Sequence, residues 1–246
     1  MVGAMKSLGK LAGVLLLGAA LSAQGAGDGP QPTPVVPATL AGQPPSDAIV
    51  LFDGKDISQW QYKDGRPGAW PIVDGILTCK SGTGNLYTKR RFGSAQIHLE
   101  FAVPYMPNAH GQARANSGVY LQGRYEIQIL DSYNNPTYSD GTAGALYGQY
   151  APLVNVSRPP KEWQTYDIIF NAPRCGADRK IDTPGTVTVL YNGVLVQDHV
   201  TIRSRTTSSD DTDVCEDGPV MLQDHYHPDV KETFMQFRNI WIRPLP

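Results

Sequence analysis

The residues most able to do acid–base chemistry lie in a short run between positions 126 and 131. Glu126 and Asp131 are five residues apart in the sequence Glu-Ile-Gln-Ile-Leu-Asp, with Gln128 between them. Two carboxyl groups in different surroundings can divide into an acid and a base, because their environments move their pKa values apart. Glu126 and Asp131 are therefore candidate catalytic residues, and Gln128 is a candidate substrate-binding residue.

The position of Asp131 leaves two interpretations open. In a regular strand, residues five apart point to opposite faces, so a β-bulge after Ile129 is needed to bring Asp131 to the face of Glu126. Alternatively, Asp131 begins the turn Asp-Ser-Tyr-Asn-Asn-Pro that follows it in the sequence. The first interpretation makes Asp131 catalytic and the second makes it structural.

A second group of polar side chains ends the segment 218–225, in the order Gln223-Asp224-His225. Histidine titrates near neutral pH and is the commonest general acid or base, so His225 is a candidate catalytic residue. A structural histidine at a strand end and a metal ligand are the alternatives. Neither His-Glu-x-x-His nor Cys-x-x-Cys occurs, so the sequence does not support a zinc site, and it names no cofactor. Gln223 and Asp224 are candidate substrate-binding residues.

Hydrogen-bond donors and one tyrosine complete the candidate substrate-binding residues. Asn116 and Arg124 lie at the ends of predicted strands and offer donors suited to hydroxyl or carbonyl oxygens. Tyr147 lies in Gly-Ala-Leu-Tyr-Gly, and an aromatic ring with a polar tip stacks well on a sugar face. Packing in the core is the alternative for Tyr147.

The strands that must position these residues are predicted from alternation. In the run from Tyr125 to Ile129, the odd positions are apolar and should face the core, so Glu126 and Gln128 should point to the opposite face. In the run from 220 to 225, Val220 and Leu222 should face the core, which leaves Met221, Gln223 and His225 on the other side. If these two strands are neighbours, that face is a site.

Strand signals dominate the rest of the chain as well. Asn192-Gly193 predicts a type I′ hairpin between two apolar runs, and Asp74-Gly75 predicts another. No long segment has a helical period, and turn signals recur at short spacing, so we expect an all-β fold of two packed antiparallel sheets. Further strands are expected at 49–52, 94–103, 117–122, 124–131, 164–171, 218–225 and 234–243, with an exposed loop at 203–217.

The domain organisation is predicted from the amino-terminal composition. Residues 1–23 have a basic start and an apolar run too short for a membrane span, which is typical of a secretory signal, although a retained anchor is the alternative. Residues 24–46 are rich in Pro and Gly and predict a linker. Residues 47–246 then form one β domain. We expect a periplasmic or secreted protein, with no membrane span after cleavage near Gln24.

Charge and cysteine content limit the partners and suggest one crosslink. The formal net charge is −2, and no stripe of Lys or Arg is visible, so nucleic acid is not expected as a partner. Oligomeric state is not predictable from this sequence. Cys175 and Cys215 lie in polar, loop-like stretches and would pair in an oxidising compartment, which leaves Cys79 as a buried free thiol.

The motifs in their order resemble a known family, the 3-keto-disaccharide hydrolase domain family, over residues 49–245. The resemblance rests on Leu51-Phe52-Asp53-Gly54-Lys55-Asp56, Trp60, Asn116-Ser117-Gly118, the run 125–131, Gly144-Ala145-Leu146-Tyr147, Trp163-Gln164-Thr165-Tyr166, Asn192-Gly193, the run 218–225 and Phe237-Arg238-Asn239-Ile240-Trp241-Ile242. It implies a concanavalin A-like jelly-roll sandwich with a carbohydrate-binding face, and hydrolysis of glycosides already oxidised at C3 of the sugar.

The resemblance also implies a mechanism that uses the keto group. A base removes the acidified C2 hydrogen, the C1 aglycone leaves by elimination with help from an acid, and water then adds. We assign His225 as base and Glu126 as acid, with the reverse assignment open, and Asn116 and Arg124 as donors to the enolate. The run from Glu126 to Asp131 is similar to the Glu-x-Asp-x-x-Glu motif of laminarinase-type glycosidases, but with an amide in the middle and a shortened last carboxylate.

Two other functions remain open from the sequence. A lectin-like module would bind a sugar without turning over any keto-glycoside. A glycosidase acting on unoxidised glucans would cleave a plain β-glucan.

Overall fold

The computed structural model describes residues 42–206, 209, 211–225 and 234–246, together with Met1. Apart from Met1, the predicted signal at 1–23 lies outside these residues, and so does most of the predicted linker. Within the described part of the chain, no helix is long and apolar enough to cross a membrane. The only helical elements there are two 3-10 turns, η1 (Gly111–Ala113) and η2 (Ser139–Gly141).

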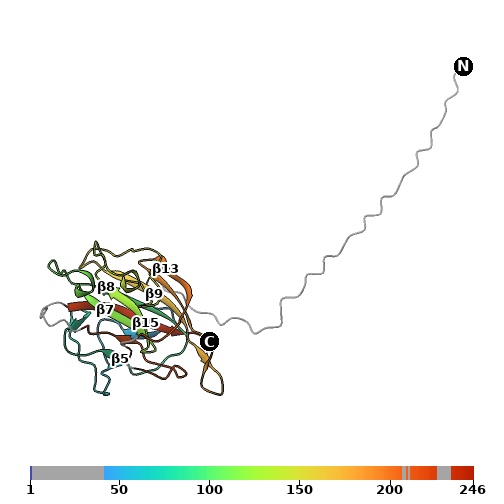
Figure 1. Cartoon of the computed structure of the whole chain (residues 1–246), viewed down its shortest axis with the longest axis horizontal. Coiled ribbons are helices and arrows are strands. Elements are labelled where there is room, and N and C mark those ends of the chain that lie inside the picture. Colours follow the sequence, from blue (N-terminus) through green and yellow to red (C-terminus); the bar gives the residue numbers. More distant parts are fainter. Residues whose placement is uncertain (2–41, 207–208, 210, 226–233) are drawn as a thin grey trace. The chain divides into compact units, whose positions relative to one another are not determined.

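The larger sheet has eight antiparallel strands in the order β13-β12-β9-β6-β15-β4-β3, with β1 paired to β15. Its longest strand, β15, is coloured red in Figure 1 and lies inside the sheet. It pairs with β6 on one side and β4 on the other. The strands are β1 (Ile49–Phe52), β3 (Ile72–Val73), β4 (Ile76–Lys80), β6 (Ala95–Ala102), β9 (Gln164–Asn171), β12 (Thr186–Tyr191), β13 (Val194–Thr201) and β15 (Phe234–Pro244).

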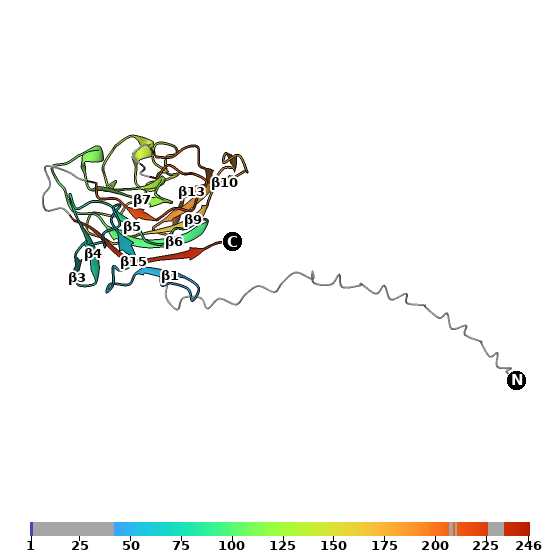
Figure 2. The same ribbon diagram turned by 90° about the horizontal axis from the view of Figure 1, so that it is seen from below.

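The smaller sheet has five antiparallel strands in the order β2-β5-β14-β7-β8, and it packs face to face on the larger one (Figure 2). The strands are β2 (Trp60–Gln61), β5 (Leu86–Thr88), β14 (Met221–Leu222), β7 (Asn116–Leu121) and β8 (Tyr125–Leu130). Of the predicted strand at 218–225, only two residues are regular strand. The sequence analysis did not predict β2 or β5, which have two and three residues.

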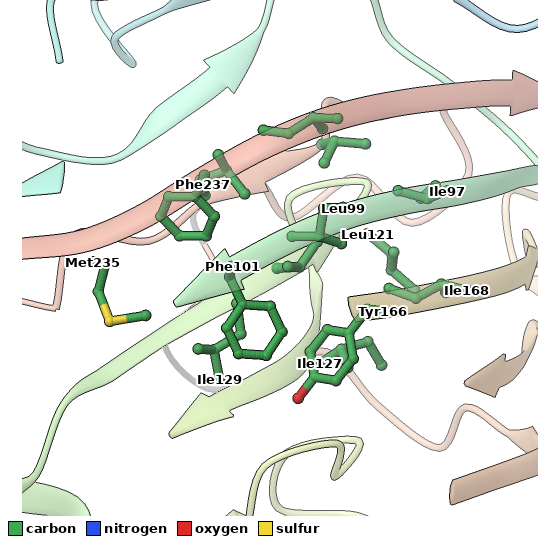
Figure 3. Close-up of a cluster of buried hydrophobic side chains, with 14 of the residues drawn as sticks. Ile97, Leu99, Phe101, Leu121, Ile127, Ile129, Tyr166, Ile168, Met235 and Phe237 are labelled. Atoms are coloured by element: carbon green, nitrogen blue, oxygen red, sulfur yellow. The ribbon is translucent and has the colours of Figure 1, made fainter. Parts of the chain in front are cut away.

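The core lies between the two sheets and confirms the predicted alternation. Ile97, Leu99 and Phe101 on β6 meet Ile127 and Ile129 on β8, and all five are buried (Figure 3). The apolar side chains of the two strands therefore pack in the core, as the period-2 pattern predicts. The fold is an all-β antiparallel jelly-roll sandwich of two sheets, and the predicted fold class is confirmed.

A disulfide joins two segments that are 40 residues apart in the sequence. Cys175 and Cys215 are bonded, with their Cα atoms 5.5 Å apart, and Cys79 is free and buried, as expected. Cys175 belongs to a two-stranded hairpin of β10 (Arg174–Cys175) and β11 (Ile181–Thr183). The bond therefore ties this hairpin to the carboxyl-terminal part of the segment 203–217.

The end of the predicted linker touches the larger sheet. The Gly42 carbonyl accepts hydrogen bonds from Asn239 Nδ2 at 2.6 Å and from Trp241 Nε1 at 2.9 Å. Asp47 forms an ion pair with Arg243 at 2.6 Å. These contacts attach residues on both sides of the predicted domain boundary to β15.

Candidate functional site

A row of residues in direct register crosses the whole of the smaller sheet. Residues directly opposite one another on neighbouring strands place their side chains on the same face. The row consists of Gln61, Tyr87, Met221, Tyr120 and Glu126, on β2, β5, β14, β7 and β8 respectively. Because Val119 and Ile127, the neighbours of the last two, face the core, this row lies on the opposite, outer face. β8, which carries Glu126, and β14, which precedes Gln223, are not neighbours, since β7 lies between them.

Tyr147 extends the row beyond the edge of the sheet. Residues 144–147 run along the outer edge of β8, where Tyr147 N donates to the Glu126 carbonyl at 3.0 Å and Gln128 N donates to the Ala145 carbonyl at 3.0 Å. Ile127 forms an antiparallel bridge with Leu146. This register places Tyr147 directly opposite Glu126. The glycine-flanked segment thus serves as a short extra strand that covers the edge of β8.

The carboxyl group of Glu126 is buried and hydrogen-bonded. The residue is 3% exposed, and Tyr120 donates its hydroxyl to Oε2 at 2.8 Å. Burial raises the pKa of Glu126 to about 7, although the hydrogen bond from Tyr120 acts in the opposite direction. Gly118 makes room for the carboxyl group, because a Cβ at that position would lie 2.5 Å from Oε1. A glutamate with a pKa near neutrality can both take and give a proton.

Gln223 supports Glu126 through Tyr120. Its Nε2 donates to the Tyr120 hydroxyl at 3.1 Å, and that hydroxyl donates its own proton to Glu126 Oε2. The backbone of Gln223 is fixed by two bonds to β7, from Ser117 Oγ to its carbonyl at 2.7 Å and from its N–H to the Gly118 carbonyl at 3.0 Å. Gln223 is thus brought to the site as a residue that orients Tyr120.

Asn116 and Gln128 join a network of amides next to Glu126. Gln112 Oε1 accepts from Gln128 Nε2 at 3.0 Å and from Asn116 Nδ2 at 3.2 Å. Gln112 and Gln128 both donate to the Gly141 carbonyl, at 2.9 and 3.1 Å. Sequence reasoning missed Gln112, which lies in η1 and carries no motif signal. The network positions the loop around Gly141 over the face.

Asp224 and His225 lie at the other end of the face. His225 is exposed and lines a small cavity of about 30 Å³ that also includes Asn116. Glu126 is opposite Tyr120, four residues from Asn116 along β7, which corresponds to about 13 Å at the rise of a strand. Asp224 Oδ2 accepts from Gly84 N at 2.7 Å and therefore ties down a neighbouring loop. The structure does not bring His225 or Asp224 to Glu126.

Arg124, which the sequence analysis predicted to bind substrate, has a buried structural position in this structure. Its side chain is fully buried, donates from Nη1 to Gln122 Oε1 at 2.9 Å and lies with Nε 3.4 Å from Asp211 Oδ1. Its carbonyl accepts from Thr206 N at 2.8 Å. Arg124 follows the tight turn at Gln122 and Gly123, where the segment 203–217 covers it. It is therefore a structural residue that holds this segment against the sheet.

Asp131 takes the structural alternative. The pairing of β7 and β8 is regular up to Asn116 and Leu130, and no bulge brings Asp131 to the face of Glu126. Its Oδ2 lies 2.6 Å from Arg114 Nη2 in a buried ion pair, and its Oδ1 accepts from Tyr133 N at 3.3 Å at the start of the turn. Burial raises the pKa of Asp131, against the opposing effect of Arg114. The bulge that the catalytic interpretation needs is absent from the pairing of β7 and β8, so the structure favours the interpretation in which Asp131 begins the turn.

The arrangement therefore supplies one buried acid–base group surrounded by hydroxyl and amide groups. Tyr120 contacts Glu126 directly, Tyr147 lies opposite it, and the hydroxyl of Tyr138 is hydrogen-bonded to that of Tyr147. Among the described residues, no group of three or more His, Cys, Asp or Glu side chains is placed to hold a metal ion. Proton transfer to or from an uncharged, hydroxyl-rich ligand is the chemistry this set of groups suits.

Comparisons with known proteins agree with the fold. A crystal structure of a Parabacteroides distasonis protein, named provisionally as a glycosyl hydrolase, is 44% identical, with a TM-score of 0.80 over 88% of this chain and 93% of that chain. Another such protein from the same organism is 19% identical, with a TM-score of 0.60 over 81% of this chain and 94% of that chain. The search of curated protein sequences gives no match.

A family model for the 3-keto-alpha-glucoside-1,2-lyase-like domain matches residues 47–243, which is nearly the whole β domain. The match includes both sheets and every residue of the cross-strand row. The chain therefore belongs to the family of 3-keto-alpha-glucoside-1,2-lyase-like domains, the family whose motifs its sequence resembles.

Proposed function

We propose that this protein cleaves 3-keto-glycosides, including 3-keto-disaccharides, and that Glu126 transfers the proton. The family and the Parabacteroides relatives support a glycoside hydrolase-type enzyme. The observation that carries the finer proposal is the single buried carboxyl group with a pKa raised to about 7, on the outer face of the smaller sheet.

The chemistry follows from the keto group. A carbonyl at C3 makes the C2 hydrogen acidic, so the Glu126 carboxylate can remove it as a proton. The electron pair of the C2–H bond then forms the C1–C2 double bond, and the C1–O bond breaks. The protonated carboxyl group returns its proton to the departing oxygen, which gives an enone and a free alcohol. Addition of water across C1 and C2 of the enone completes a net hydrolysis.

One carboxyl group can serve both steps because C2–H and the glycosidic oxygen are on adjacent carbons. A general acid–base works best when its pKa lies near the operating pH, and burial gives Glu126 such a value. Tyr120 donates to the carboxylate and stabilises its charged form. His225 lies well along the face from Glu126, so it is not required for this version of the mechanism, and its predicted role as base is left to experiment.

The test compares 3-keto-glycosides with their unoxidised parents. The purified protein should release the alcohol from the keto substrates and leave the parents intact. Replacing the C2 hydrogen with deuterium should slow the reaction if that bond breaks in the rate-limiting step. Glu126→Gln, which keeps the size and loses the proton transfer, should lower kcat by at least about a hundredfold. Glu162→Gln, on an exposed position, is the matched control and should change nothing.

The alternatives give different results. Binding of sugars with no turnover of any keto-glycoside would identify a lectin-like module. Cleavage of a plain β-glucan would identify an ordinary glycosidase. His225→Ala separates the two assignments of the base: a loss as large as that of Glu126→Gln would restore His225 to the mechanism, and unchanged kinetics would remove it.

A further inference from the structure

An exposed tyrosine that the sequence analysis did not select contacts Tyr147, the residue opposite Glu126. Tyr138 is 48% exposed, although it is a large aromatic residue. Its ring lies directly over Gly141, where an added Cβ would be 2.0 Å from a ring carbon. Any residue other than glycine at 141 would therefore displace this ring. The position of the Tyr138 ring therefore depends on the glycine at 141.

Contacts with Tyr147 connect Tyr138 to the candidate site. The two hydroxyls are hydrogen-bonded, and the rings meet edge to face with centroids 6.2 Å apart. Since Tyr147 is directly opposite Glu126, this contact connects Tyr138 to the residue that faces Glu126 across the edge of β8. The pKa of Tyr138 is raised, chiefly by desolvation and by the bond to Tyr147, with smaller effects from the charges of Asp140 and Glu126. Its hydroxyl is therefore neutral at physiological pH.

The loop that carries Tyr138 is held in place before any ligand arrives. The Gly141 carbonyl accepts from the amides of Gln112 and Gln128, and the Asp140 carbonyl accepts from Gly148 N at 3.0 Å. An aromatic ring on a fixed loop can bind a ligand without the entropy loss of ordering it first. This property distinguishes Tyr138 from an exposed tyrosine on a free surface.

We propose that the ring of Tyr138 binds the leaving sugar of a 3-keto-disaccharide, and so makes the enzyme selective for a sugar over a small alcohol as leaving group. The inference rests on the proposed function. The reacting C1 and C2 atoms must reach Glu126, which is 3% exposed, so the other half of the substrate must lie toward the open side. Tyr138 is an exposed aromatic side chain next to Tyr147, the residue opposite Glu126. The apolar C–H face of a pyranose covers an aromatic ring, and the sugar hydroxyls remain in water.

The experiment uses two substrates with the same 3-keto-glucosyl group, one with a methyl aglycone and one with a glucosyl aglycone. Tyr138→Ala should lower kcat/KM for the disaccharide roughly tenfold, in the range expected for one aromatic contact, and change the methyl glycoside by less than about twofold. Tyr138→Phe, which keeps the ring, should retain most of the disaccharide activity. Tyr105→Ala is the control, because Tyr105 is also exposed, at 58%, but contacts Lys161 on another loop.

Three outcomes would overturn the inference. Equal losses on both substrates would place Tyr138 in the chemistry or in the folding of the loop, and the melting temperature separates these two. A loss in Tyr138→Phe as large as in Tyr138→Ala would mean that the hydroxyl acts through Tyr147. Unchanged kinetics would mean that the leaving sugar binds elsewhere.

If the wild-type protein turns over neither substrate, the proposed function fails instead. In that case, calorimetry still tests whether the Tyr138 ring binds the sugar. It compares the affinity of the disaccharide for Glu126→Gln with its affinity for Glu126→Gln/Tyr138→Ala.

Discussion

The position and the pKa of the Glu126 carboxyl group depend on three neighbouring residues. Ile127 packs in the core, so Glu126 points to the opposite face of the strand. On that face, Gly118 leaves space for the carboxyl group, and the hydroxyl of Tyr120 fixes its direction. Burial makes the charged form costly, which raises the pKa to about 7. The stability of the fold and the activity of the site should therefore both change with pH near this value.

The first prediction concerns stability. The folded protein holds the Glu126 proton more tightly than the unfolded chain, so this contribution is complete below a pH of about 4.5 and is lost as the pH rises through about 7. Glu126→Gln does not titrate. The wild type should therefore lose stability relative to Glu126→Gln as the pH rises. Between pH 4.5 and pH 8, the difference between their free energies of unfolding should change by about 3 kcal/mol at most, in favour of the variant. Urea unfolding at both pH values measures this, with Glu162→Gln as control. A difference that does not change with pH would contradict the pKa shift.

The second prediction concerns activity. If Glu126 removes the C2 proton, the free enzyme must hold it as a carboxylate, and kcat/KM should rise with pH and level off above about 7. If Glu126 is instead the acid that assists the leaving group, as the sequence analysis assigned it, kcat/KM should fall over the same range. A pH profile on one 3-keto-glycoside distinguishes the two. A profile that is flat through this range would remove Glu126 from proton transfer.

At the scale of elements, the segment 203–217 connects distant parts of the smaller sheet. Thr206 Oγ1 accepts from Glu126 N at 3.0 Å, and Asp211 pairs with Arg91 at 2.8 Å. Its carboxyl-terminal part is tied to the β10–β11 hairpin by the disulfide and by an ion pair from Arg179 to Asp213 at 2.7 Å. The segment is thus fixed at both ends although its described residues contain no named strand.

Removing the disulfide should test how far this segment supports the site. The bond joins cysteines 40 residues apart, and in the chain-entropy model closing such a loop stabilises the fold by roughly 4 kcal/mol. Cys175→Ser/Cys215→Ser should therefore unfold at a lower temperature and lose part of its activity, because Thr206 is held less firmly. Cys79→Ser serves as the control for cysteine replacement. Free thiols at 175 and 215 in the untreated protein, found by mass mapping of peptides, would contradict the crosslink.

For the whole molecule, the disulfide and the amino-terminal sequence lead to the same expectation. We propose that the protein is exported to the periplasm or secreted, because residues 1–23 are typical of a signal and disulfides persist in oxidising compartments. The mature chain should begin near Gln24, well before Gly42, which contacts the outer face of β15. Amino-terminal sequencing of the protein from a cell fraction measures this. A mature protein that still begins with Met1 would contradict it.

The sequence by itself determined the two-sheet β fold, the family and the faces of the strands around Glu126. These follow from local patterns, since alternation decides which side chains enter the core and Asn-Gly decides where a hairpin turns. Only the tertiary structure decided that Arg124 is buried and that Asp131 pairs with Arg114, because both partners lie outside the motifs. It also decided the neighbours of Glu126. Register across strands brings together Tyr120, Glu126 and Tyr147, and Gly141 places Tyr138 beside them, whereas spacing along one strand says nothing about the next.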